Sequence, residues 1–206
     1  MDDVKKPEMD KDGSYDDLLV ERFKGGDKPA FDELYNKYKT RIIGYLYRFL
    51  GDRMLADEVA QEAFIHVYTN IWGYKPVGMF RAWLYKIASN LAKNELKKRA
   101  RRHETSLDAE IDGPGSPTLA DMLSDEHLSP ETIAANDELK AVIEEILKRL
   151  PDIYREVMVL CVIEGLSYEE AAEALSTNVK TVSSRLARAR ELFIGHLNKV
   201  KGMGLK

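Results

Sequence analysis

The feature that most constrains this fold is a stretch of 32 residues without a single lysine or arginine, at positions 104–135. It contains eight acidic side chains, three prolines and two glycines. Proline and glycine interrupt regular elements, and a run of like charges opposes compact packing. We therefore expect a flexible acidic linker, which would divide the 206-residue chain into two small domains.

Both flanking segments place apolar residues at helical spacing. Ile42, Leu46 and Phe49 recur at intervals of three and four before Gly51, and Ile143, Ile146 and Leu150 follow the same rule. No strand-like alternation competes. The fold class predicted is all-α, with two small helical domains. The predicted boundaries are a disordered tail at 1–14, a first domain at 15–103, the linker at 104–135, a second domain at 136–200 and a tail at 201–206.

Composition excludes several classes of protein. Cys161 is the single cysteine, so no internal disulfide framework is available, and the four histidines lack metal-ligand spacing. No carboxylate cluster or nucleophile–base pair suggests an enzyme. The N-terminus lacks the apolar core of a signal peptide, and no run is long enough to span a membrane. We expect a cytoplasmic, non-enzymatic protein without cofactor, metal or membrane contact.

Charge is distributed unevenly along the chain, although the formal net charge is only −4. Residues 86–103 hold seven basic side chains against Glu95, and residues 177–206 hold seven against Glu191. Two separate cationic segments indicate contact with a polyanion at two places.

The segment 164–190 has the pattern of a helix-turn-helix. Ser167 followed by Glu170 predicts a capping box, and the turn Ser176-Thr177-Asn178 precedes a second helix that Asn178 would cap. We expect that helix to bury one apolar face and to present a polar, cationic face to the major groove. The alternative is a pair of packed helices with a solvated basic face. The predicted buried residues are Val179, Val182, Leu186 and Ala189.

The segment 80–102 combines aromatic and cationic side chains. Its apolar positions place Trp83 in the core, whereas Tyr85 falls on the polar side, where core and binding roles are equally open. Trp72 and Tyr74 precede it in a glycine-containing loop. Aromatic rings beside a cationic face suit unstacked bases, since every base offers a face for stacking.

Three stretches together resemble the extracytoplasmic-function (group 4) sigma factors of bacterial RNA polymerase. They are LADEVAQEAFIHVY, FRAWLYKIASNLAKNELKKRARR and LPDIYREVMVLCVIEGLSYEEAAEALSTNVKTVSSRLARAR, and the resemblance covers residues 15–200. It implies that the first domain is sigma region 2, that the second is region 4, and that the linker threads through the polymerase.

The resemblance also implies roles for particular residues. Binding to the β′ clamp helices of core RNA polymerase would use Asp57, Glu58, Gln61, Glu62 and Phe64. Contact with −10 promoter DNA would use Trp72, Tyr74, Arg81, Tyr85, Lys86, Asn90, Asn94, Lys97 and Lys98. Contact with −35 DNA would use Thr177, Asn178, Lys180, Thr181, Ser183, Ser184, Arg185 and Arg188. The helices over 139–163 would meet the β flap, and an anti-sigma factor would be a further partner.

Three departures from the family pattern concern the second domain. Ser176 stands where glycine is usual, Thr177 stands where an apolar residue is usual, and Ser183 stands where a basic residue is common. The loss of that cation puts the exact −35 sequence in question. A free helix-turn-helix regulator that acts without polymerase is the alternative function.

Overall fold

The structure, a computed structural model, describes residues 10–105 and 130–202, and all regular elements in these ranges are helical. The first unit consists of α1 (Asp10–Lys24), α2 (Lys28–Leu50), α3 (Arg53–Asn70), the short η1 (Ile71–Gly73) and α4 (Phe80–Thr105). The second consists of α5 (Pro130–Lys148), α6 (Asp152–Met158), η3 (Val159–Ile163), α7 (Tyr168–Ala174) and α8 (Val179–Gly202). The predicted all-α class with two helical domains is confirmed.

Three helix boundaries differ from those expected. α1 begins at Asp10 although its first turns contain Gly13, because packing against the rest of the unit overrides weak propensity. α4 continues to Thr105, and α5 begins at Pro130, since proline is well tolerated in a first helical turn. Most of the predicted linker lies outside the described residues, as do residues 1–9 and 203–206.

Local capping explains where several helices begin and end. Gly51 adopts a φ of 73° and ends α2, with its N–H donating to the carbonyl of Tyr47. Asp52 caps α3 by accepting from the N–H of Leu55 at 3.1 Å. Asp27 precedes α2 but makes no side-chain cap for it, because its carboxylate accepts from Arg22 at 2.9 Å.

The core of the first unit is rich in aromatic rings. Tyr38, Tyr45, Phe80 and Tyr85 are almost fully buried, and the rings of Tyr45 and Tyr85 meet edge to face at 5.3 Å. Each ring adds a large apolar area, which lets a few short helices form a stable core. On α1, Leu19 is buried in this core, whereas the neighbouring Leu18 is half exposed.

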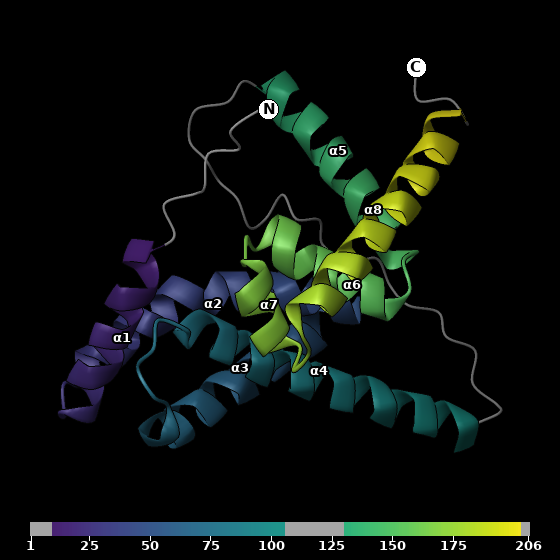
Figure 1. Ribbon diagram of the computed structural model, residues 1–206. Helices are drawn as coiled ribbons and strands as arrows, with labels where there is room; N and C mark the ends of the chain where they lie inside the picture. The colour runs from purple at the N-terminus through teal and green to yellow at the C-terminus, as the bar shows by residue number, and fades with distance from the viewer. Residues whose placement is uncertain (1–9, 106–129, 203–206) are drawn as a thin grey trace.

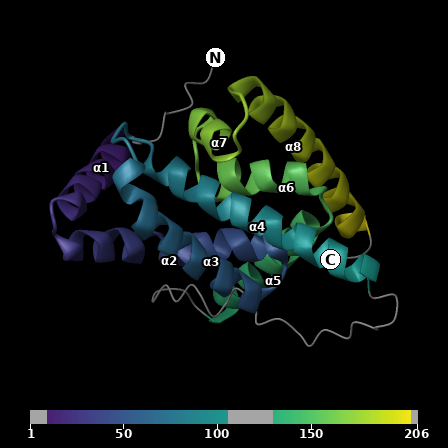
Figure 2. The ribbon, with the colours of Figure 1, turned by 90° about the horizontal axis from the view of Figure 1, so that it is seen from below.

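The two units pack against each other. Figure 1 shows α6, α7 and α8 stacked over α2 and α4, and Figure 2 shows the same pairing from below. α7 lies against α4, while α5, α6 and η3 contact α2. Buried apolar residues of both units form one continuous cluster. The arrangement therefore brings the two predicted DNA-contacting segments into one body.

Candidate functional site

The helix-turn-helix has the local structure predicted for it. Ser167 Oγ accepts from the N–H of Glu170 at 3.1 Å, and Ser167 N donates to Glu170 Oε2 at 2.8 Å, which completes the capping box. Asn178 Oδ1 accepts from the N–H of Thr181 at 2.8 Å and caps α8. Ala171 and Ala172 are buried where the two helices cross. These predictions are confirmed.

The outer face of α8 presents the residues predicted for −35 contact. Val182, Leu186 and Ala189 are buried beneath it, as expected. Val179 is 39% exposed rather than buried, because side chains of a helix lean toward its N-terminus and the first residue has no preceding turn to cover. The exposed residues are Asn178, Lys180, Ser183, Ser184 and Arg188, and Thr177, Thr181 and Arg185 are partly exposed.

The turn also explains why glycine suits position 176. Ser176 has a φ of 50°, and it is the only non-glycine residue with positive φ among the residues described. This left-handed conformation brings Cβ close to the following carbonyl and costs roughly 1–2 kcal/mol for a residue other than glycine. The chain therefore accepts strain in the turn of its helix-turn-helix.

Ser176→Gly is expected to raise the free energy of unfolding by about 0.5–1 kcal/mol, because relief of the strain exceeds the extra entropy that glycine loses on folding. Urea denaturation of the full chain measures this difference. The matched control is Ser183→Gly, in the interior of α8, which should lower stability. If both variants lost the same free energy of unfolding, the conclusion that Ser176 is strained would be wrong.

The first half of α4 is covered by carboxylates of the second unit. Arg81 donates to both carboxylate oxygens of Glu170, at 3.0 and 2.6 Å, and to the carbonyl of Gly165 at 3.3 Å. Lys86 donates to Glu173 at 2.9 Å. Two of the cations predicted to contact −10 DNA are thus neutralised within the chain.

Tyr85 lies in the interior, so its expected place on the polar face is wrong. Its ring is fully buried and its hydroxyl donates to Glu164 at 2.7 Å. The contacts from α2 and the second unit enclose it, which the periodicity of α4 alone does not reveal. Burial and the nearby charge of Glu164 raise the pKa of Tyr85 well above its usual value. Trp83 packs against the core as predicted.

A second contact across the units centres on Glu156, a carboxylate only 4% exposed. It accepts hydrogen bonds from Ser89 and from Tyr45, the latter at 3.2 Å, and its Oε1 lies 3.0 Å from Lys93 Nζ. Buried charges are retained where they are paired and hydrogen-bonded. Glu156 therefore ties α6 to both α2 and α4.

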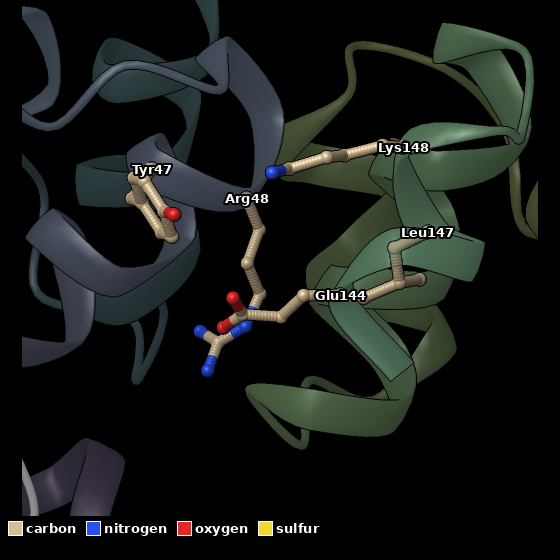
Figure 3. Close-up of a pocket in the computed structure, with 5 residues that line it drawn as sticks. All are labelled: Tyr47, Arg48, Glu144, Leu147 and Lys148. Atoms are coloured by element: carbon tan, nitrogen blue, oxygen red, sulfur yellow. The ribbon is translucent and has the colours of Figure 1, made fainter. Parts of the chain in front are cut away.

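Arg48 adds a polar contact to the residue that follows η3: its Nη1 lies 3.5 Å from Glu164 Oε1. Figure 3 shows that Tyr47 and Arg48 of α2 face Glu144, Leu147 and Lys148 of α5 across a small pocket. Burial raises the pKa of Glu164 above the usual range, with Tyr85 and the nearby arginines opposing that shift. The wider π turn of η3, closed by Glu164 N donating to Val159 O at 2.9 Å, carries Glu164 into this interface.

The second half of α4 remains accessible. Asn90, Asn94, Lys97 and Lys98 are exposed, and Lys98 pairs with Glu95 at 2.7 Å within the helix. Such a row of polar and cationic side chains suits the phosphate backbone of a nucleic acid. The residues predicted for −10 contact are therefore divided into a covered group and an open group.

The loop before α4 is held by α1, a contact that the sequence analysis missed. Asp17 accepts from the hydroxyl of Tyr74 at 2.7 Å and from the N–H of Gly78 at 2.6 Å. Gly13, one turn earlier, lies so close that a Cβ there would be 2.6 Å from the Gly78 carbonyl. Burial and the bond to Asp17 raise the pKa of Tyr74. The buried Tyr74 therefore shapes the loop, whereas Trp72 is 59% exposed.

The residues predicted to bind polymerase lie along α3. Glu58, Gln61 and Glu62 are exposed, and Asp57 pairs with Arg53 at 3.1 Å. Phe64 is buried and packs edge to face on Tyr35 at 4.8 Å. It forms the floor of an apolar groove of about 370 Å³. The groove is lined by Phe31, Tyr35, Gln61, Phe64, Ile65 and Tyr68.

Ile65 and Tyr68 at this groove were missed from sequence. They are 62% and 44% exposed, which is unusual for large apolar side chains beside a fully formed core. The sequence signal that could have identified them is their position on α3, where both lie outside the apolar stripe of Val59, Ala63 and Val67. The groove thus gives the acidic surface of α3 an apolar centre.

No helix in the described part of the chain is long and apolar enough to cross a bilayer. The described residues also contain no group of three or more histidine, cysteine or acidic side chains placed to hold a metal ion.

Comparison with known proteins places both units in one family. A family model described as Sigma-70 region 2 matches residues 34–102, and one described as Sigma-70, region 4 matches residues 140–193. The RNA polymerase sigma-H factor of Pseudomonas aeruginosa is 42% identical over 180 residues, which are 85% of this chain and 90% of the relative. The ECF RNA polymerase sigma factor SigW of Bacillus subtilis is 37% identical over 172 residues, 84% and 91% of the two chains.

Solved structures agree in fold. CnrH, in complex with the cytosolic domain of CnrY, has a TM-score of 0.65 at 25% identity and covers 90% of this chain and 98% of its own. The sigma factor RpoE of Bartonella quintana, solved with the anti-sigma factor NepR, has a TM-score of 0.66 at 19% identity, covering 82% and 96%. With region 2 and region 4 both matched and relatives covered over nine-tenths of their length, the chain belongs to the extracytoplasmic-function sigma factors.

Proposed function

We propose that this chain is an alternative sigma subunit, which binds core RNA polymerase and directs it to promoters through −10 and −35 elements. The observation that supports this most directly is the pairing of two DNA-reading elements in one chain. α8 offers an exposed cationic face after a helix-turn-helix, and α4 offers a second one beside an aromatic loop. A free regulator needs only the first.

The proposed domains are region 2 at 15–103, region 4 at 136–200 and the acidic linker between them. The α3 groove with Asp57, Glu58, Gln61 and Glu62 would meet the β′ clamp helices, and α5 with α6 would meet the β flap. The residues on α4 and α8 would contact the −10 and −35 elements as assigned above. The chain supplies binding energy and specificity, and the polymerase supplies the chemistry, so the role is not enzymatic and its place is the cytoplasm.

An anti-sigma factor is the proposed regulator. CnrH was solved with the cytosolic domain of CnrY, and the Bartonella sigma factor with an anti-sigma factor. The exposed apolar side chains of Ile65, Tyr68 and Trp72 provide surface on region 2 for such a protein partner.

Run-off transcription tests the proposed function. Core RNA polymerase, the purified chain and a fragmented library of the host genome should yield discrete transcripts that share two spaced upstream elements. Retention on core polymerase is measured in parallel. Binding to operator DNA without polymerase, together with no transcripts, would instead favour the free helix-turn-helix regulator.

Asp17→Asn is expected to weaken recognition of the −10 element by about 10- to 150-fold while binding to core polymerase is unchanged. The carboxylate uses one oxygen for Tyr74 and the other for Gly78 N, and an amide offers only one acceptor. A hydrogen bond to a charged group contributes roughly 1.5–3 kcal/mol. Promoter titrations with substituted −10 sequences measure the effect.

The matched control for that experiment is Glu21→Gln. Glu21 lies one turn further along α1, its side chain is 56% exposed, and its carboxylate lies 3.5 Å from Lys24 Nζ. It should leave promoter discrimination unchanged. An equal effect of both variants would mean that Asp17 stabilises α1 in general rather than the loop.

A further inference from the structure

Four carboxylates of the second unit lie on the side of α4 that is proposed to read DNA. Glu170 and Glu173 come from α7, Glu156 from α6, and Glu164 follows η3. Their partners on α4 are Arg81, Tyr85, Lys86, Ser89 and Lys93. Every one of these contacts joins residues more than sixty positions apart, so none is a by-product of local helix geometry.

The contacts resemble those that a nucleic acid would make. Arg81 meets Glu170 in a two-pronged arrangement, the same geometry in which a guanidinium binds a phosphate or a guanine edge. Both side chains are mostly buried, at 12% and 13% exposure, so the pair is poorly screened by salt. DNA and these carboxylates therefore compete for the same donors.

Glu170 has a second task that fixes its position. Its Oε2 accepts from Ser167 N as the acidic member of the capping box that starts α7. The carboxylate that neutralises Arg81 is thus held in place by the helix-turn-helix itself. Region 4 brings this carboxylate to α4 only when the two units are packed together.

The covered and open parts of α4 differ in kind. Of the residues proposed to contact the −10 element, Arg81, Tyr85 and Lys86 are engaged by the second unit, whereas Asn90, Asn94, Lys97 and Lys98 are exposed. A closed chain therefore retains polar and cationic side chains for the phosphate backbone, while the donors of Arg81 and Lys86 are occupied. Affinity for nucleic acid would then be mainly electrostatic and would depend less on sequence than in the open chain.

We propose that the acidic face formed by Glu156, Glu164, Glu170 and Glu173 is an intramolecular stand-in for DNA, which holds the free chain closed and blocks −10 reading until the two units separate. That the closed chain blocks promoter reading rests on the proposed function. That the two units of the free chain are closed does not. Polymerase, which must engage regions 2 and 4 at separate surfaces, would favour the open chain and free the α4 face. The apparent affinity for a −10 sequence is reduced by the fraction of chains that are closed.

The test combines a distance with a binding measurement on the full chain. Spin labels at Asn70 and Asn198, both exposed and one in each unit, report the separation of the units after Cys161→Ser. Fluorescence anisotropy reports binding of a single-stranded oligonucleotide with the non-template −10 sequence of a promoter found by run-off transcription. A scrambled oligonucleotide separates sequence reading from general charge attraction.

The first variant is Glu170→Gln with Glu173→Gln. Glutamine at position 170 still serves a capping box, so the helix-turn-helix is preserved while both ion pairs to α4 lose their charge. The second variant, Glu164→Lys with Glu173→Lys, places cations against Arg48 and Lys86 and leaves Glu170 untouched. The control is Glu169→Gln with Glu145→Gln: Glu169 is exposed on α7, and Glu145 of α5 pairs at 3.2 Å with Arg149, the first residue after that helix.

We expect a single short distance in the wild type and the control, and longer distances in at least the charge-reversal variant and in chains bound to core polymerase. Specific −10 binding should rise by about tenfold or more in each variant that opens, as expected when the open fraction rises from a minor population. Affinity for the scrambled oligonucleotide should rise only by the amount that the more positive charge of each variant explains.

Each contrary result has a definite meaning. A long or broad distance in the wild type, or an unchanged distance in both variants, would overturn the closed state. Opening without a gain in specific binding would overturn the masking of α4, while transcripts in the run-off assay would leave the proposed function standing. Absence of transcripts would count against the proposed function, whatever the distances show.

Discussion

A chain carrying Ile65→Glu is expected to bind core RNA polymerase about 30- to 700-fold more weakly than the wild type, with an unchanged melting temperature. Ile65 lies at the edge of the apolar groove on α3 and is 62% exposed, so a charge there costs the free chain little. Buried beneath a partner, the same carboxylate would lose its water without gaining an ion pair. Losses of about 2–4 kcal/mol are typical of central interface residues, and 1.4 kcal/mol is tenfold in affinity.

The control for this prediction is Met54→Glu. Met54 is 84% exposed in the first turn of the same helix and does not line the groove. It adds the same charge to the same element, so it corrects for general electrostatic repulsion by the polymerase surface. Affinity for fluorescently labelled core polymerase should be nearly that of the wild type. If Met54→Glu and Ile65→Glu weakened binding equally, the groove would not be the contact.

Arg188→Ala is expected to weaken initiation at promoters that depend on the −35 element by about 5- to 150-fold. A base-specific arginine contact contributes roughly 1–3 kcal/mol of discrimination. Arg188 pairs with Glu191 at 2.7 Å, and both side chains are more than half exposed. Exposed pairs of this kind are weak, so the guanidinium can turn to DNA at small cost.

Arg190→Ala is the matched control for Arg188. It removes the same charge from the same helix, but Arg190 lies roughly 200° further around the axis. It should reduce promoter affinity slightly and without regard to the −35 sequence. Initiation on promoters with a scrambled −35 element separates the two effects. If Arg188→Ala weakened binding to core polymerase as much as it weakened initiation, Arg188 would not have the role of a −35 contact.

The sequence was sufficient to predict those parts of the structure that depend on neighbours in the chain. Helical spacing, the capping box of Ser167 and Glu170 and the cap at Asn178 were all predicted, because each is decided within a few residues. The same local chemistry applies to Ser176, whose positive φ is the conformation that glycine adopts without strain. Region 2 and region 4 could be assigned because three stretches of the sequence resemble those of a known family.

Where each helix lies was decided only by the tertiary structure. Periodicity indicates which face of α4 is apolar, but not that Glu164, Glu170 and Glu173 cover the other face, so Tyr85 was expected on a polar surface and is buried. Nor does it indicate that Asp17 of α1 holds a loop some sixty residues away. Such contacts depend on how whole units pack. That packing is stabilised by many individually weak contacts between residues that are distant in the chain. The sequence by itself determined the helices, the caps and the family of this chain. Only the tertiary structure decided which side chains those helices leave open to DNA and polymerase, because that depends on contacts between residues far apart in the chain.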